Sequence, residues 1–245
     1  MNLSEMSTII HIFLLFTSVL ARSEQLDTLA LLHGSRIEKK IALTFDACPS
    51  STHNGYDSCI VQTLVDSGVP ATFFVSGKWI LRHKREAKYL ASVSFFELGN
   101  HSYSHPHCLN ISDDSIQHEL QRTELLLKKI SKTSSRLFRP PYVETDGRII
   151  RIAQNLGLVT VMYDLAPGDP DTTISRERLI RYITSHVRNG SIIVLHVNGR
   201  GWHTAEVLPE IIQSLRCKGF VFKKISDLIP VHNSPHHPSI KKTAR

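Results

Sequence analysis

Stretches typical of buried strands alternate along this chain with amphipathic stretches typical of helices, and this alternation constrains the fold more than any other feature. The expected strands are rich in β-branched and aromatic residues, which indicates strands covered on both faces, as in a parallel sheet. They lie at 40–46, 71–76, 95–99, 137–139, 158–163, 191–196 and 220–222. The expected helices lie between them, at 56–66, 115–130, 175–187 and 204–215. The pattern predicts one α/β domain folded as a β/α barrel, with an open doubly wound sheet as the alternative.

The first residues of the chain predict a signal peptide. Residues 9–20 form a mostly apolar run, shorter than the roughly 20 residues that a helix needs to span a bilayer. Val19 and Ala21 supply small residues at the cleavage positions, so we expect a signal peptide over 1–21, export to the periplasm, cell surface or medium, and no stable membrane span. Because the segment before the run contains Glu5 and no Lys or Arg, an uncleaved anchor or a buried terminal helix is the competing interpretation.

The basic residues of the chain are dispersed. Its 29 Lys and Arg against 22 Asp and Glu give a formal net charge of +7, which favours anionic neighbours. The sequence shows no dense basic helix and no nucleic-acid-binding motif, so we expect no nucleic-acid partner. Residues 231–245 lack hydrophobic periodicity and predict a flexible basic tail behind the folded domain, which we place at 37–230.

The four cysteines leave the redox state open. Their spacings include no CxxC pair of the kind found in structural zinc clusters, so we expect no such cluster. In an exported protein, one or two disulfides and buried free thiols are both compatible with this count. The residues concerned are Cys48, Cys59, Cys108 and Cys217.

Polar residues interrupt the expected strands only where each strand ends. They are Asp46, His101, His105, Arg139, Asp169 and His196. The carboxyl ends of the strands meet at one face of a β/α barrel, so we expect these side chains to converge there. Two histidines and one carboxylate with open positions form a usual ligand set for a hydrolytic Zn²⁺ or a related divalent ion.

Five segments, taken in order, resemble the motifs of the polysaccharide deacetylase family (carbohydrate esterase family 4, the chitin and peptidoglycan N-deacetylases). The resemblance covers about residues 37–230 and implies a single domain folded as a distorted (β/α)7 barrel. It also implies metal-dependent removal of N-acetyl groups from a cell-surface or exogenous glycan, either peptidoglycan or chitin-like. The segments are Thr44-Phe45-Asp46, His101-Ser102-Tyr103-Ser104-His105, Arg139-Pro140-Pro141-Tyr142, Gly168-Asp169 and Leu195-His196-Val197.

The resemblance assigns the acid–base chemistry to four residues. It implies that Asp46 is the general base and that Arg139 orients it. It implies that His196 is the general acid and that Asp169 tunes its proton affinity. Each proton transfer of this kind contributes on the order of 10²–10⁴-fold to the rate.

The resemblance places the remaining functions around these four. It implies that His101 and His105 bind the metal and that the Tyr142 backbone N–H donates to the oxyanion. Trp202 follows the sixth expected strand, and we predict that it lines the cleft, although a packing role is an equal alternative. Asp46 is the third candidate metal ligand.

Two departures from the family pattern affect the metal and the substrate. The family carries a second aspartate, a metal ligand, where this chain has Ala47, so Asp46 faces the incompatible roles of base and ligand. Ala166 and Pro170 stand where the family often has Asp and Trp, which predicts a reshaped substrate platform. Two rival functions therefore stay open: a glycan-binding pseudoenzyme with a decayed metal site, and a related C–N amidohydrolase acting on a small amide.

Overall fold

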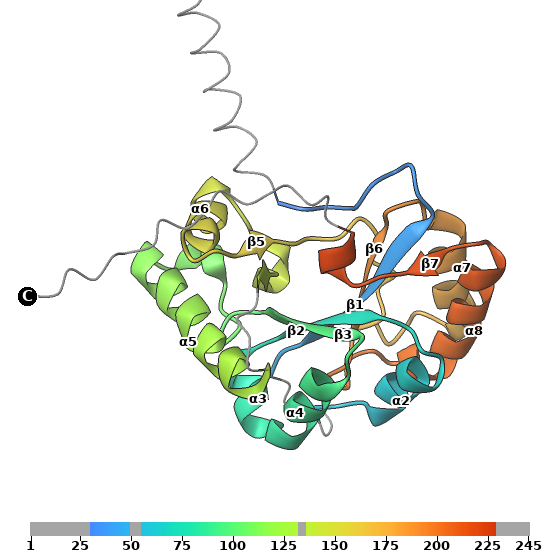
Figure 1. Ribbon diagram of the computed structural model, residues 1–245, viewed down its shortest axis with the longest axis horizontal. Coiled ribbons are helices and arrows are strands. Elements are labelled where there is room, and N and C mark those ends of the chain that lie inside the picture. The colour runs from blue at the N-terminus through green and yellow to red at the C-terminus, as the bar shows by residue number, and fades with distance from the viewer. Residues whose placement is uncertain (1–29, 50–54, 132–135, 229–245) are drawn as a thin grey trace, which may run out of the picture.

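In the computed structural model, seven parallel strands form one curled sheet with helices on its outer side (Figure 1). The structure describes residues 30–49, 55–131 and 136–228, so the predicted signal peptide at 1–21 and the predicted tail at 231–245 lie outside it. The sheet order is β5-β4-β3-β2-β1-β6, and β7 pairs with β1. The strands are β1 (Lys40–Ala47), β2 (Ala71–Val75), β3 (Phe96–Asn100), β4 (Leu137–Phe138), β5 (Val159–Thr160), β6 (Ile192–His196) and β7 (Val221–Phe222).

The central strand β1 brings two functional residues to the same level. It pairs in parallel with β2 on one edge and β6 on the other, and Asp46 lies opposite His196 in the β6 register. Side chains alternate along a strand. Phe45 and Ala47 therefore join the apolar layer shared with the helices, whereas Thr44 and Asp46 face the inside of the curl.

The two edges of the sheet are linked beyond β5. Leu165 forms a parallel bridge with Ile193 of β6, and the Val194 N–H donates to the Leu165 carbonyl at 3.0 Å. This link confirms the distorted barrel and excludes the open doubly wound sheet. β5 is shorter than the predicted strand at 158–163 because Leu31 pairs with Val161, after which the chain crosses toward β6.

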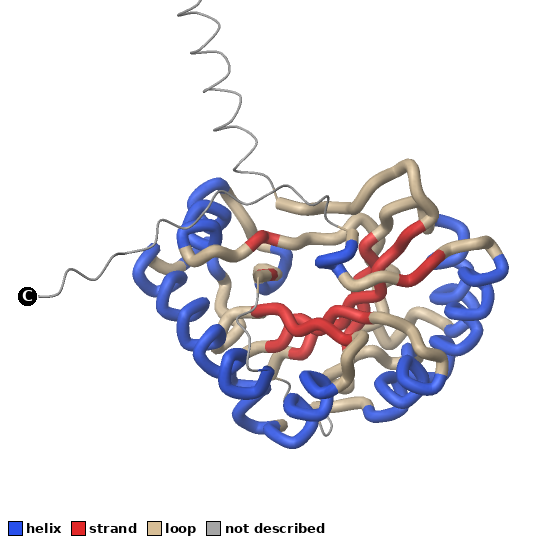
Figure 2. The backbone as a smooth tube through the Cα atoms, in the orientation of Figure 1, coloured by secondary structure: helices blue, strands red, loops and turns tan. Residues whose placement is uncertain are grey.

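The helices cover the outer side of the sheet (Figure 2). All four predicted helices are present, and three short helices were not predicted: α3, α4 and α6. Asp146 caps α6, since its side chain accepts the Ile149 N–H at 2.8 Å. The helices are α2 (Ser58–Asp66), α3 (Gly77–Arg82), α4 (Lys84–Ser92), α5 (Asp113–Ser131), α6 (Gly147–Asn155), α7 (Arg176–His186) and α8 (Thr204–Cys217).

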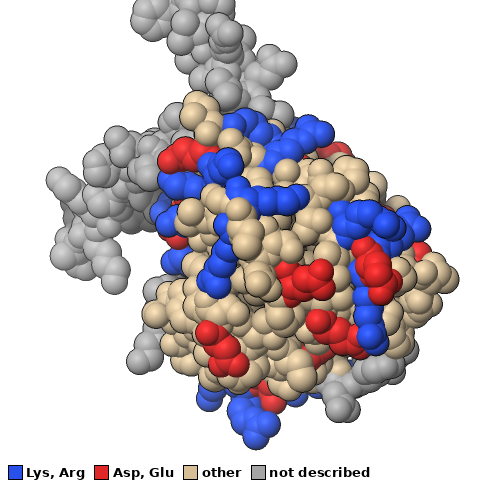
Figure 3. All heavy atoms as spheres, turned by 90° about the vertical axis from the view of Figure 1, so that its right-hand side faces the viewer, with Lys and Arg blue, Asp and Glu red and all other residues tan. Residues whose placement is uncertain are grey.

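Charges on the face that carries α7 and α8 are mixed. Figure 3 shows Lys and Arg side chains interspersed there with Asp and Glu. Arg176 of α7, for example, forms an ion pair with Glu206 of α8. This face is therefore not a dense basic surface of the kind that binds nucleic acid. Among helices in the described ranges, none combines the length and the apolarity needed to cross a bilayer.

Candidate active site

The predicted catalytic residues converge on one pocket of about 300 Å³ at the carboxyl ends of the strands. Seven of the eight predicted site residues line it: Asp46, His101, His105, Arg139, Tyr142, Asp169 and His196. Trp202 is the exception. Its side chain is 41% exposed and is not among the residues that line the pocket, and its backbone N–H donates to the Asp169 carbonyl at 3.1 Å. A contact between Trp202 and the substrate stays a prediction.

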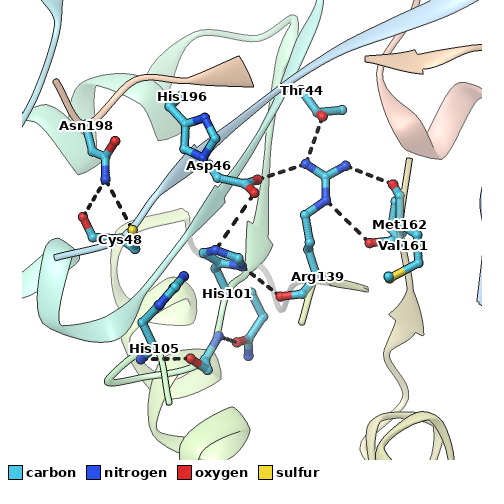
Figure 4. Close-up of polar contacts among 12 residues, drawn as sticks. Thr44, Asp46, Cys48, His101, His105, Arg139, Val161, Met162, His196 and Asn198 are labelled. Carbon is cyan, nitrogen blue, oxygen red and sulfur yellow. Dashed lines mark hydrogen bonds and ion pairs between the residues drawn. The ribbon is translucent and has the colours of Figure 1, made fainter. Parts of the chain in front are cut away.

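Asp46 is held as an ionised, oriented carboxylate. The buried Arg139 guanidinium donates through Nη1 to Asp46 Oδ1 and to Thr44 Oγ1, both at 2.8 Å (Figure 4). Arg139 Nη2 donates to the Met162 carbonyl at 3.0 Å, which fixes the guanidinium plane. Burial opposes ionisation of Asp46, but the Arg139 charge, followed by His101 and His196, outweighs it and lowers the Asp46 pKa below its ordinary value. An ionised carboxylate facing a pocket can act as a general base.

The Arg-Pro-Pro-Tyr segment is a stiff turn, as its two prolines predict. Tyr142, its last residue, has φ 55°, and the following Val143 has φ 63°. Positive φ is uncommon for non-glycine residues and is costly for a β-branched one. Ser102 and His105 are the other non-glycine residues with positive φ in the described part of the chain. All four lie in the two loops beside the pocket, so the backbone of these loops adopts conformations that are uncommon for non-glycine residues.

His196 forms the second acid–base pair. Asp169 Oδ1 accepts from His196 Nδ1 at 2.9 Å, and Asp169 Oδ2 accepts from the His196 backbone N–H at 2.8 Å. Thr204 Oγ1 also donates to Asp169 Oδ2, at 2.9 Å. Burial would lower the pKa of His196, but the Asp169 hydrogen bond and charge, followed by Asp46, raise it above the ordinary value. His196 therefore keeps its proton to higher pH than an exposed histidine.

The comparison with known proteins agrees with this arrangement. Residues 33–161 match the family model described as polysaccharide deacetylase. The chain belongs to the polysaccharide deacetylase family. The peptidoglycan-N-acetylmuramic acid deacetylase PdaA of Bacillus subtilis is 30% identical over 201 residues, which cover 80% of this chain and 73% of PdaA.

Solved structures of polysaccharide deacetylase relatives share the fold. The structure of PdaA, a family 4 carbohydrate esterase, gives a TM-score of 0.74 at 28% identity, covering 86% of this chain and 88% of PdaA. A family 4 pseudoenzyme from Bacillus anthracis gives a TM-score of 0.75 at 26% identity, covering 83% of this chain and 69% of its own. The chain is thus similar both to a named deacetylase and to a named pseudoenzyme.

The metal side of this polysaccharide deacetylase pocket is less complete. His101 Nδ1 bonds the Arg139 carbonyl at 2.8 Å, which leaves Nε2 facing Asp46 Oδ2 at 3.9 Å. Burial lowers the pKa of His101, and burial with the His101 charge lowers the pKa of His105 to about 3. Both imidazoles are therefore neutral, as metal ligands must be.

A third ligand is missing beside these two imidazoles. In the portion of the chain that the structure describes, no three His, Cys, Asp or Glu side chains are grouped to hold a metal ion. Asp46 is bonded to Arg139, and Ala47 is fully buried in the apolar layer. The residues present do not fit a three-ligand metal centre, and the ligand set Asp46, His101 and His105 stays a prediction.

Cys48 adds a buried thiol to the pocket. All four cysteines are free thiols in the structure. Asn198 Nδ2 donates to the Cys48 carbonyl at 2.9 Å and lies 3.2 Å from Cys48 Sγ. Burial, followed by the Asp46 charge, raises the pKa of Cys48. The group is therefore a neutral thiol, which is a poor metal ligand.

Arg200 also lines the pocket, and the sequence reasoning missed it. It lies four residues after His196, between Gly199 and Gly201. These flanking glycines were the available signal, because a Gly-Arg-Gly loop directly after a strand end allows an unusually close approach to the site.

Proposed function

We propose that this chain hydrolyses the N-acetyl groups of an N-acetylated glycan. One observation carries the proposal: two buried acid–base pairs face the same pocket, and their pKa values are shifted in opposite directions. The pKa of Asp46 is lowered and the pKa of His196 is raised, so Asp46 stays ionised to lower pH and His196 keeps its proton to higher pH than the free side chains. Paired groups whose environments separate their pKa values typically divide the roles of base and acid. The names of the relatives support an N-acetylated substrate.

The proposed reaction moves two protons. Asp46 takes a proton from a water molecule as the water oxygen bonds to the acetamido carbonyl carbon. The resulting tetrahedral oxyanion accepts a hydrogen bond from the Tyr142 backbone N–H. His196 then gives its proton to the amide nitrogen as the C–N bond breaks. Acetate and a free amino sugar are the products.

We infer that a divalent ion, with zinc as the first candidate, would bind weakly in this pocket. The two neutral imidazoles of His101 and His105 are suitable donors, but the described residues offer no third ligand grouped with them. When bound, such an ion would polarise the acetamido carbonyl. The steps assigned to Asp46, Tyr142 and His196 do not depend on it.

A glycan-binding pseudoenzyme is the second candidate function. Two observations favour it: Ala47 stands in place of the family's second aspartate, and a family 4 pseudoenzyme is among the similar structures. The fully hydrogen-bonded pairs Asp46–Arg139 and His196–Asp169 favour catalysis, because glycan binding alone requires neither.

The test is acetate release across a panel of N-acetylated glycans. Peptidoglycan fragments and chitooligosaccharides are incubated with the wild type, Asp46→Asn and His196→Ala, each with and without added Zn²⁺. We expect the wild type to release acetate and expose amino groups in equal amounts, and each variant to lose about 10²-fold or more of the rate. Glycan binding by the wild type without acetate release under any metal condition would establish the pseudoenzyme instead.

We also propose export of the mature chain, since a cell-surface or exogenous glycan requires it. The argument rests on the sequence of residues 1–21, and cleavage after Ala21 would leave Arg22 as the first residue. N-terminal sequencing of the protein recovered from outside the cytoplasm tests this, and retention of residues 1–21 there would contradict cleavage.

A further inference from the structure

Arg200 presents a cation at the opening of the pocket. It is an exposed lining residue on the loop between β6 and α8. The loop is held at both sides: the buried Asn198 bonds the Cys48 carbonyl at 2.9 Å, and Gly199 takes φ +80°. At Gly201 a Cβ atom would lie 2.6 Å from Thr204 Oγ1 and 2.8 Å from Asp169 Oδ2, so only glycine fits. The backbone around Arg200 is therefore tied to the catalytic Asp169.

Arg200 is a charged group of the pocket that has no carboxylate partner among the described residues. Its lining contains two carboxylates and two guanidinium groups. Asp46 is paired with Arg139, and Asp169 is bonded to His196 and Thr204. Among the described residues, no ion pair joins Arg200 to an acidic side chain.

The charge of Arg200 also acts on the histidines of the pocket. It contributes to lowering the pKa of His105, after burial and His101, and it opposes the rise in the pKa of His196. The Arg200 side chain also interacts with the Cys48 side chain, which is a neutral partner. A guanidinium group presents parallel N–H donors that match a carboxylate. A neutral N-acetylated sugar offers no partner of that charge, whereas an acidic sugar does.

We propose that Arg200 binds a carboxylate carried by the substrate, so that this chain selects an acidic N-acetylated sugar over a neutral one. The lactyl carboxylate of N-acetylmuramic acid in peptidoglycan has the required chemistry. This inference rests on the proposed function for its substrate class. Arg200 would then determine specificity, while the acid–base steps stay with Asp46 and His196.

The test compares two probes that differ only in charge. A soluble peptidoglycan disaccharide fragment with a free lactyl carboxylate is compared with the same fragment as its carboxamide, using calorimetry on the full chain in the His196→Ala background to prevent turnover. We expect the carboxylate probe to bind at least tenfold more tightly, as a charge-assisted hydrogen bond allows. Raising the ionic strength should reduce this preference.

Substitutions at Arg200 then test whether this residue causes the preference for the carboxylate probe. Arg200→Gln should remove it, Arg200→Lys should keep part of it, and Arg151→Gln, at an exposed position on α6, should keep all of it. Equal binding of both probes before substitution would overturn the inference. So would an equal loss for both probes in Arg200→Gln, which would indicate a role at the oxyanion common to all substrates.

Failure of this inference is separable from failure of the proposed function. A retained carboxylate preference without acetate release from any glycan would contradict the enzyme and leave the Arg200 site standing. Acetate release from neutral and acidic glycans at equal kcat/KM would support the enzyme and contradict the Arg200 site.

Discussion

The two sides of the pocket differ in how completely their polar groups are partnered. On the side of β1 and β6, every group has its partner: Asp46 bonds Arg139, and His196 bonds Asp169. On the side of the loop after β3, His101 and His105 are oriented and neutral, but within residues 30–49, 55–131 and 136–228 no third ligand is grouped with them. The structure therefore organises the proposed acid–base groups more completely than the proposed metal ligands.

The strongest way to break this comparison is to remove Arg139. Arg139→Leu leaves the Asp46 carboxylate buried without its cation, and breaking a buried pair in this way costs about 3–5 kcal/mol. We expect a loss of that size in the free energy of unfolding measured by urea, together with loss of acetate release. Arg151→Gln serves as the exposed control. A loss below about 1 kcal/mol would show that the pair does not organise this side.

The second prediction concerns pH. Asp169 raises the pKa of His196, so the acid form of His196 persists until the pH rises through that raised value. Asp169→Asn removes this charge and lowers the pKa. The alkaline limb of kcat/KM for acetate release should then move to lower pH, with a rate loss of about 10²-fold. The acid limb, set by Asp46, should stay in place, and movement of the acid limb alone would contradict the assignment.

The third prediction concerns metal binding by His101 and His105. With two imidazole ligands, we expect the purified protein to lose bound Zn²⁺ on desalting, as measured by metal analysis. Because the main core cluster consists of apolar side chains and a weakly bound ion contributes little to stability, chelation should change the Tm by less than about 2 °C. His105→Gln should abolish the residual binding. One tightly held ion per chain after desalting would show a ligand that the described residues do not reveal.

The smallest expected effect is at Trp202. Its side chain is exposed and lies outside the pocket lining, so Trp202→Ala should change KM for the glycan by no more than about twofold. A tenfold rise in KM with unchanged kcat would instead place Trp202 against the bound glycan.

The fold followed from the sequence where local signals were strong. Apolar runs followed by polar residues marked β1, β3 and β6. Asp46, His101 and His196 reached the pocket because parallel strands share one carboxyl end. No helix was delimited at α3 and α4 because each is short and buries few large apolar side chains: Trp79 and Ile80 in α3, and Leu90 in α4. The predicted range of β5 was too long because Val161 pairs with Leu31, which is distant in sequence.

The site was predictable for residues on strands and less so for residues on loops. Asp46, Arg139 and His196 are placed by the register of the sheet. Arg200 and Trp202 lie two residues apart in one loop, yet only Arg200 lines the pocket. That outcome depends on the close packing of Gly201 against Asp169, which no periodic pattern encodes.

The central claim is that the acid–base side is a working catalyst. Its most direct test measures glycan binding and acetate release on the same peptidoglycan strands, for the wild type and Asp46→Asn. We predict that Asp46→Asn binds the strands within about threefold of the wild type and releases acetate at least about 10²-fold more slowly. Equal acetate release by the two proteins, or none by the wild type despite binding, would contradict the claim.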